Sequence, residues 1–362
     1  MHPRKLYIAY GNRAREMTID LLTAANIAAE IPQGASIALK PNLVVAAPAE
    51  NGATTHTGIV EGIIQYLQAH GHTNISIMEG SWLGDSTARA YSVCGYHELE
   101  KKYGVKLYDL KKDQTRSVST PVGPMKICCR PMDADYVISL PVLKGHCQTL
   151  MTCALKNSKG CIPDSEKRHF HTMGLHRPIA ALATVFKPDL FIVDSICGDL
   201  NFEEGGTPIQ TNRMLLGHDP VQIDAYGCSL LGIDPRDVDY IGYAEDWNVG
   251  STEINEQDIV YVNDPASAPA YPAPSGLVSR LTCCVKQNSA CSACYGNLVH
   301  ALYRLEDNHG LRCDKPVYIG QAFAGKALEG IGIGRCCTGA SVHVQGCPPS
   351  AENILNTLLE NL

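Results

Sequence analysis

The sequence lacks several features that would place it in familiar functional classes. No apolar run reaches the roughly 18 residues that a membrane-spanning helix needs. The opening residues, MHPRKLYIAYGNRARE, contain no apolar core of a signal peptide. Positive charge is not in excess, because 30 Lys and Arg stand against 37 Asp and Glu, giving a formal net charge of −7. We therefore expect a cytoplasmic protein that neither crosses a membrane nor binds nucleic acid.

What the chain has in excess is cysteine, with 16 residues among 362. Thiols stay reduced in the cytoplasm, so this excess predicts metal binding or catalysis in preference to disulfides. Some cysteines are expected to be small buried apolar residues, and Cys94, Cys197 and Cys228 fit that description because no other cysteine is near them in the sequence.

Short apolar segments alternate with helical patterns in the first 262 residues. Strands are predicted at 34–41, 74–78, 105–110, 134–140 and 190–195, and helices at 57–70, 178–186 and 220–231. This alternation predicts a layered α/β domain with a parallel or mixed sheet covered on both faces. Residues 263–276 are rich in Pro, Ala and Ser and are predicted to be a linker. Residues 277–362 would then form a small cysteine-rich α/β domain.

Eight of the 16 cysteines follow this linker. Cys291 and Cys294 form a C-x-x-C pair just before a helical pattern, so both sulfurs can face one metal centre. Cys336 and Cys347 lie in the glycine-containing stretch GRCCTGASVHVQGCPP, and two prolines stiffen the backbone after Cys347.

Four thiolates suit either a [4Fe–4S] cluster or a zinc ion. Structural zinc sites usually have two short C-x-x-C turns and this chain has one, so we predict a [4Fe–4S] cluster, with zinc as the alternative. The predicted ligands are Cys291, Cys294, Cys336 and Cys347. The reserve candidates are Cys337, Cys283 and Cys284, and Cys313 is expected in the core.

The stretch from IGRCCTG to VHVQGCPPSAENIL resembles the cluster-binding end of the small subunit of respiratory NADH dehydrogenase. That resemblance covers about twenty residues. It implies one cluster ligand in the G-C-P-P turn, at Cys347, and another in the cysteine loop upstream.

A basic segment, residues 139–171, follows the predicted strand 134–140, at the kind of strand end where open α/β sheets bind ligands. Lys144, His146, Lys156 and Lys159 lie among glycines and apolar residues there, so burial with a functional role is expected. Their charges predict a small anionic substrate, and a histidine would move a proton. Lys167 and Arg168 suit a solvated surface equally well.

His169 and His171 are two residues apart and would share one face of a strand. They are the further candidates for proton transfer or metal binding. Other polar residues are expected to converge at the same sheet edge and to contact the substrate: Lys40, Asn42, Thr55, His56, Glu79, Ser81, Asp194 and Asp224.

Six motifs in this region resemble the family catalogued as domain of unknown function 362. They are KPNLV (40–44), MEGS (78–81), ADYVISLPVLKGH (134–146), ALKNSKGCIP (154–163), IVDSI (192–196) and DPVQIDAYG (219–227). Members of that family are often joined to iron–sulfur modules, so the resemblance implies that the cysteine tail belongs with this domain.

The order of KGH, a downstream lysine and HFH is also distantly similar to the nickel-pincer lactate racemase. That likeness implies Lys156 as the residue that tethers the cofactor, with His146 and His171 beside the metal. The glycine–serine run around the racemase lysine is not reproduced here.

Together, these patterns predict an iron–sulfur redox enzyme that acts on a small anionic substrate and exchanges electrons with a partner protein. The enzymatic alternative is a racemase, epimerase or lyase of 2-hydroxy acids. The alternative from another class is an electron carrier or cluster-delivery protein, which would need no buried pocket of lysine and histidine.

Overall fold

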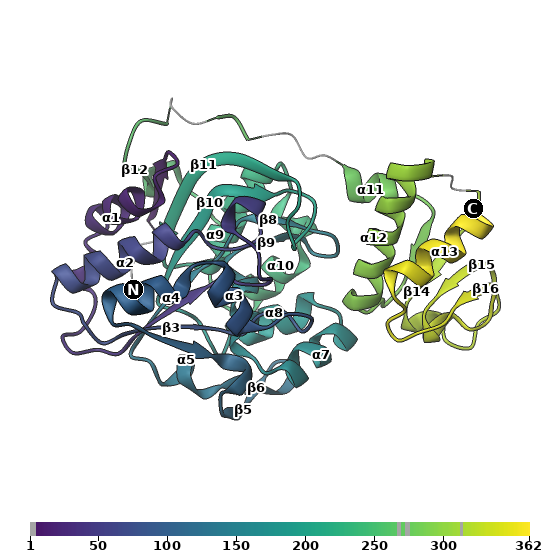
Figure 1. Ribbon diagram of the computed structural model, residues 1–362, viewed down its shortest axis with the longest axis horizontal. Coiled ribbons are helices and arrows are strands. Elements are labelled where there is room, and N and C mark those ends of the chain that lie inside the picture. The colour runs from purple at the N-terminus through teal and green to yellow at the C-terminus, as the bar shows by residue number, and fades with distance from the viewer. Residues whose placement is uncertain (1–4, 266–268, 272–275, 312–313) are drawn as a thin grey trace. The chain divides into compact units, whose positions relative to one another are not determined.

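The computed structural model describes residues 5–265, 269–271, 276–311 and 314–362 (Figure 1). The chain divides into two compact units, Met1–Lys167 with His176–Pro274, and Arg168–Leu175 with Ser275–Leu362. Part of the linker predicted at 263–276, the first four residues of the N-terminal segment and Cys313 lie outside the described residues.

The larger unit is built on an eight-stranded sheet in the order β12-β1-β11-β10-β7-β2-β3-β4. Neighbouring strands from β4 through β3, β2 and β7 to β10 run parallel, whereas β11 is antiparallel to β10 and β1. The predicted layered α/β fold with a mixed sheet is therefore confirmed. The strands are β1 Leu6–Tyr10, β2 Ile37–Pro41, β3 Ile75–Glu79, β4 Lys106–Asp109, β7 Tyr136–Leu140, β10 Leu190–Asp199, β11 Pro208–Gly217 and β12 Ile259–Tyr261.

Helices and two hairpins complete this unit. The helices are α1 Ala14–Ala24, α2 Thr57–Ala69, α3 Thr87–Val93, α4 Tyr96–Tyr103, α5 Cys129–Asp133, α6 Ala154–Asn157, α7 Asp164–Met173, α8 His176–Ala183, α9 Pro220–Leu231 and α10 Asp239–Asp246. One hairpin pairs β5 (Thr115–Thr120) with β6 (Gly123–Cys128), and the other pairs β8 (Lys144–His146) with β9 (Leu150–Thr152).

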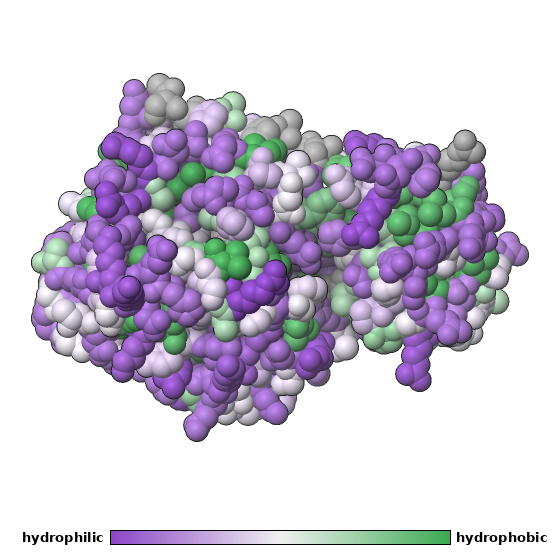
Figure 2. All heavy atoms as spheres, in the orientation of Figure 1, coloured by the Kyte–Doolittle hydropathy of each residue, from purple (hydrophilic) through white to green (hydrophobic). Residues whose placement is uncertain are grey.

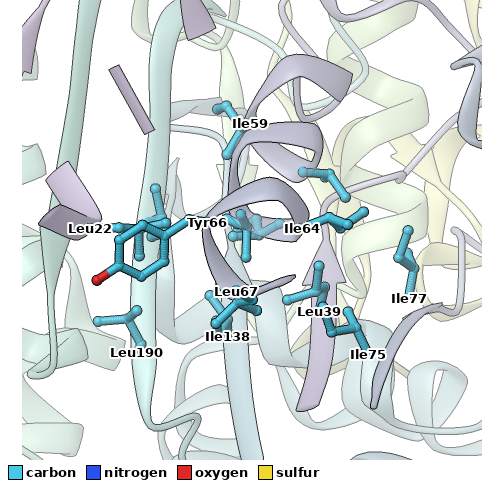
Figure 3. Close-up of a cluster of buried hydrophobic side chains, with 14 of the residues drawn as sticks. Leu22, Leu39, Ile59, Ile64, Tyr66, Leu67, Ile75, Ile77, Ile138 and Leu190 are labelled. Carbon is cyan, nitrogen blue, oxygen red and sulfur yellow. The ribbon is translucent and has the colours of Figure 1, made fainter. Parts of the chain in front are cut away.

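The main hydrophobic core lies where α1 and α2 pack on one face of the sheet (Figure 3). In α2, apolar residues recur at helical spacing and point toward apolar side chains from successive parallel strands. Residues of this core include Leu22, Ile59, Ile64, Leu67, Leu39, Ile77, Ile138 and Leu190. Burying one such side chain stabilises the fold by about 1.5–3 kcal/mol.

Side chains alternate along a strand, so the residues between these core positions face the other side of the sheet. Lys40 and Ser139 are such residues, in β2 and β7, and α6 packs on that side against β7. The strand pattern thus places a charged and a hydroxyl side chain beneath α6, near the carboxyl ends of the parallel strands.

The smaller unit contains a four-stranded parallel sheet in the order β13-β14-β15-β16. The strands are β13 Val285–Gln287, β14 Val317–Ile319, β15 Leu328–Ile333 and β16 Ala340–Val344, and the helices are α11 Leu277–Leu281, α12 Ser292–His309 and α13 Ala351–Asn361. Helices α12 and α13 pack against each other. The α/β character predicted for this part of the chain is confirmed.

On the face shown in Figure 2, hydrophilic residues predominate and apolar residues gather in small groups. Among the described residues, no helix has both the length and the apolar composition for crossing a membrane.

The strand expected around His169 and His171 is wrong, because both residues lie in helix α7. Glu166 and Phe170 are buried and four residues apart, which is helical spacing. Residues two apart on a helix point in nearly opposite directions, so these two histidines do not share a face. His169 is exposed and His171 is partly buried.

Candidate functional site

A buried ion pair lies where β2 and β3 end. Lys40 Nζ lies 2.9 Å from Glu79 Oε2 and also donates to Pro41 O and to Asn157 Oδ1. Asn157, from α6, donates in turn to Ser139 Oγ at 2.9 Å. Three acceptors saturate the three N–H donors of the Lys40 ammonium. Lys40 and Glu79 therefore connect the ends of β2 and β3 to α6.

Lys167 is buried, although its polar sequence suited a surface position equally well. Its Nζ donates to the carbonyl oxygens of Gly80 and Ser81, at 2.9 and 2.8 Å. Burial lowers the pKa of Lys167. This lysine fixes the loop that follows β3, where Ser81 was expected to contact a substrate.

Asn42 and Thr55 connect the ends of β2 and β7. Thr55 Oγ1 donates to Leu140 O at 2.7 Å and accepts the backbone N–H of Asn42 at 2.8 Å. Asn42 Oδ1 accepts the N–H of Val44. Both side chains are buried and committed to protein partners, so they shape the sheet edge.

His56, the residue before α2, is paired with Asp194 of β10. Asp194 Oδ2 accepts from the His56 backbone N–H at 2.7 Å and from its ring Nδ1 at 2.8 Å. Burial acts to lower the pKa of His56, but the Asp194 carboxylate raises it above the usual value. The pair resembles in its chemistry the imidazole and carboxylate of proton-transfer sites, in which the acid orients the ring.

The lysine–histidine cluster, as we call it, comprises Lys144, His146, Cys147, Lys156, Lys159 and Glu203. Lys144 Nζ donates to Ala53 O and to Glu203 O, at 2.6 and 2.7 Å, which ties two loops to β8. Burial lowers the pKa of Lys144 to about 8. His146 Nε2 lies 3.3 Å from Glu203 Oε1. The prediction that Lys144, His146 and Lys156 are buried is confirmed.

Three members of this cluster meet a spacing criterion for metal binding. One ligand atom each from His146, Cys147 and Glu203 lies within 4.8 Å of the others, so the group could hold a metal. However, His146 Nδ1 accepts the backbone N–H groups of Gln148 and Thr149, at 3.1 and 3.2 Å. Burial holds the pKa of His146 well below its usual value, so the ring is neutral and carries its hydrogen on Nε2. A metal ligand needs a lone pair at Nε2, so this ring is placed to donate a hydrogen bond from Nε2 and not to bind a metal there.

Lys156 and Lys159 belong to one helical run formed by α6 and the 3-10 helix Ser158–Cys161. Asp224 of α9 fixes the start of this run, because its carboxylate accepts the N–H groups of Ala154 and Leu155. Burial raises the pKa of Asp224 to about 7. Asp224 therefore holds the start of the helical run that carries Lys156 and Lys159, and in this way it positions both lysines.

The four-cysteine centre, Cys291, Cys294, Cys336 and Cys347, lines one hollow of the smaller unit. Cys291 is the residue before α12, Cys294 lies in its first turn, and the other two come from the loops after β15 and β16. All four are free thiols. Burial raises the pKa of Cys294 to about 12, and the neighbouring thiols act in the same direction. Binding a cation here would favour the thiolate forms, which are the forms that ligate metals.

The spacing of the sulfurs can be compared with that in two kinds of metal site. Four thiolates around one zinc ion would lie about 3.8 Å apart, given Zn–S distances of about 2.3 Å and tetrahedral angles. In the described part of the chain, no three of these four sulfurs all lie within 4.8 Å of one another. The irons of a [4Fe–4S] cluster are at four separate corners, so its ligands are more widely spaced. As a donor set, four thiols suit either such a cluster or a zinc ion.

Of the tandem pair, Cys336 lines the hollow and Cys337 does not. Cys337 is buried, with its Sγ 3.9 Å from Gly320 O. Gly334 has a φ of +81°, and a Cβ there would lie 3.6 Å from Cys294 Sγ. That distance is an ordinary contact, so the positive φ is the reason that glycine is favoured at residue 334.

The remaining cysteines behave differently. Cys283 is disulfide-bonded, so it is not a reserve ligand, and the expectation of reduced thiols is wrong for it. That expectation came from the redox state of a compartment, which says nothing about local geometry. Cys94, Cys197 and Cys228 are buried, as predicted.

The fold and these two groups of residues define an α/β protein with a buried basic cluster and a cysteine-rich C-terminal unit. The chain belongs to the family described as "Domain of unknown function (DUF362)", which matches residues 37–229. The thylakoid-associated protein sll1697 of Synechocystis sp. is 26% identical over 220 residues, covering 58% of this chain and 66% of that relative. A structure of the lactate racemase apoprotein from Thermoanaerobacterium thermosaccharolyticum shows a distant likeness, with 10% identity, a TM-score of 0.41 and coverage of 62% of this chain and 56% of that one.

Three residues of the site had no part in the sequence-based prediction, Cys147, Asn157 and Glu203, and for Lys167 a surface position was considered equally suitable. Asn157 and Lys167 lie in the same basic segment as the predicted lysines, so the segment itself was the available signal. Glu203 lies in the connection between β10 and β11, and nothing in the sequence links that connection to β8.

Proposed function

We propose that the protein is a redox enzyme that carries an iron–sulfur cluster on Cys291, Cys294, Cys336 and Cys347 and acts on a small anionic substrate in the lysine–histidine cluster. The observation that carries this proposal is that four free thiols from separate segments line one hollow. When bound, the cluster would supply one-electron transfer. Four protein thiolates saturate a four-iron cluster and leave no iron open for Lewis-acid chemistry.

The lysine–histidine cluster supports the second half of the proposal. Lys144, Lys156 and Lys159 bring three amines close to His146. An electron carrier needs no buried amines, because burying them lowers stability unless they bind something. The cluster would bind an anion through the lysines, and His146 would donate a hydrogen bond to it from Nε2.

Anaerobic purification followed by iron, sulfide and zinc analysis tests the cofactor. We expect about four iron and four sulfide per chain, the composition of a [4Fe–4S] cluster. One equivalent of zinc without sulfide would refute the iron–sulfur assignment. Cys94→Ser is the control, because Cys94 is buried in the other unit and lines no part of the hollow.

Substrate turnover is tested separately. His146→Gln and Lys156→Met should lower turnover or anion binding and leave the iron content unchanged, because both residues are in the larger unit. If both variants kept full anion binding and full turnover, the lysine–histidine cluster would not be the substrate site, and an electron-carrier function would be favoured.

A further inference from the structure

Two amines of the lysine–histidine cluster have few hydrogen-bond acceptors. In the described part of the chain, Lys156 Nζ donates to a single acceptor, Thr152 Oγ1 at 3.1 Å. The ammonium of Lys159 has no hydrogen-bond or ion-pair partner among these residues. Lys40, by contrast, has three acceptors. An ammonium has three N–H donors, so burying one with a single acceptor favours the neutral amine.

Burial also favours the neutral amine of Lys156, because it is the main cause that holds the pKa of Lys156 well below its usual value. Glu203 and Cys147 act to raise this pKa, whereas the positive charges of Lys159 and Lys144 lower it. Lys159 follows Lys156 by three residues in one helical run, so the two side chains project to the same side. A desolvated lysine beside a second cation is an activated nucleophile at neutral pH.

The two amines therefore differ in role. Lys156 is 7% exposed, and its nitrogen is held by Thr152 at the start of the run. Lys159 is more exposed, and no protein carboxylate is paired with it in the described residues. A substrate carboxylate would supply that missing partner.

We propose that Lys156 forms an imine with the carbonyl carbon of a 2-oxo acid whose carboxylate binds to Lys159. This inference rests on the proposed function, because it names the class of the small anionic substrate. A 2-oxo acid has a carboxylate directly beside its carbonyl group, which matches a nucleophilic amine next to an unpaired ammonium.

The step is balanced without an added oxidant or reductant. The lone pair of Lys156 Nζ forms a bond to the carbonyl carbon, and the carbonyl oxygen takes a proton to give a carbinolamine. The C–O bond then breaks, the oxygen leaves as water with the two hydrogens of the amine, and the C=N bond forms. The amine supplies both hydrogens of that water, and His146, which belongs to the same cluster and has a hydrogen on Nε2, can donate a hydrogen bond to the oxygen as it leaves.

The test is reductive trapping on the full-length, anaerobically purified protein. The protein is incubated with pyruvate and sodium cyanoborohydride, which reduces an imine to a stable amine, and is then mapped by peptide mass spectrometry. We expect the reduced adduct at Lys156, its loss in Lys156→Arg and Lys156→Met, and unchanged labelling in Lys126→Arg. Lys126 is an exposed lysine of β6 and serves as the control.

The role of Lys159 is tested by comparing two ketones. Lys159→Gln should reduce labelling by pyruvate about ten-fold, the effect of losing about 1.4 kcal/mol of binding. Labelling by acetone, which has no carboxylate, should fall less, and Lys159→Arg should restore labelling by pyruvate. Equal effects on the two ketones would overturn the assignment of the carboxylate to Lys159.

Labelling spread over exposed lysines, or retained in Lys156→Arg, would overturn the imine. Oxalate carries carboxylates but no ketone, so it can bind an anion site without forming an imine. Its binding therefore separates failure of the imine from failure of the proposed function. Calorimetric binding of oxalate that depends on Lys159, together with no adduct at Lys156, would exclude the imine and leave the proposed anion site in place. Iron analysis of the same samples tests the cluster independently of both.

Discussion

The carboxylate of Asp194 accepts two hydrogen bonds from one residue, His56: the backbone N–H at 2.7 Å and the ring Nδ1 at 2.8 Å. Asp194 is fully buried in β10 and the imidazole of His56 is partly exposed. Burial acts to lower the pKa of His56, but the carboxylate raises it. The folded protein therefore binds the proton more tightly than the unfolded chain. The resulting stabilisation is complete below the unfolded pKa of about 6.5 and is lost as the pH rises through the folded pKa.

Asp194→Asn should lower the pKa of His56, because the negative charge beside the ring is removed. We expect the variant to lose about 1–3 kcal/mol of unfolding free energy at pH 6 and less at pH 8. NMR titration of the ring and urea denaturation at both pH values measure the two effects. His97, which is exposed and near Glu100, is the internal control. A destabilisation independent of pH would show that Asp194 acts only through its backbone hydrogen bond.

The tandem cysteines give a matched pair of variants. Cys336→Ser should lose most of the bound iron, because Cys336 lines the hollow with the other three thiols. Cys337→Ser should keep it, because Cys337 is buried away from the hollow and lies near Gly320 O. Iron content and the visible absorption of the anaerobic protein measure the difference. Equal loss in both variants would contradict the choice of Cys336 as the ligand.

Asp224 should give the stability of the larger unit a characteristic pH dependence. Burial raises its pKa from the ordinary value of 3.8 to about 7. When folding raises the pKa of a carboxyl group, the folded protein loses stability as the pH rises from the pKa of the unfolded state through the pKa of the folded state. The loss is on the order of 4 kcal/mol in the limit of a fully buried carboxylate.

Asp224→Asn removes this titration while keeping one acceptor for the N–H of Ala154 or Leu155. The variant should therefore gain stability relative to the native protein as the pH rises from 5 to 8, as measured by urea denaturation. Asp234→Asn is a control at an exposed carboxylate of the same unit. A constant difference between Asp224→Asn and the native protein over this pH range would contradict the assignment.

The sheet and its helices were predictable because each segment repeats a local pattern. β2 was predicted at 34–41 and α2 at 57–70, and both occur within a few residues of those bounds. Lys40, Glu79 and Asp194 were identified because they end or interrupt apolar strands, which a sequence displays directly. The C-x-x-C spacing likewise indicated a helix start at Cys291.

The sequence-based prediction was wrong or incomplete where the hydrophobic pattern is short or where a contact joins distant parts of the chain. His169 and His171 flank Phe170, and three residues fit a strand as well as a helix; only the spacing of Glu166 and Phe170 distinguishes them. The contacts of Glu203 and Asn157 depend on tertiary packing, which brings the connection after β10 to β8 and α6 to β2. No periodicity of the chain encodes these contacts.

The contributions of Lys40 and Glu79 to the free energy of unfolding should be strongly coupled. The two side chains are 2% and 3% exposed, so removing one partner leaves an uncompensated buried charge. Lys40→Met or Glu79→Gln alone should cost about 3–5 kcal/mol of unfolding free energy. The double variant Lys40→Met/Glu79→Gln should be less destabilised than the two single variants together, because no buried charge remains.

Urea denaturation of the native protein, the two single variants and the double variant measures this coupling as a double-mutant cycle. The matched control is the pair Lys102 and Glu61, with an Nζ–Oε1 distance of 2.7 Å and a lysine side chain that is 60% exposed. Solvent screens that pair, so its coupling should stay below about 1 kcal/mol. A coupling equally small for Lys40 and Glu79 would mean that water or a rearranged loop replaces the lost partner at this strand end. In that case the strand ends would not form the rigid support on which α6, and with it Lys156, is held.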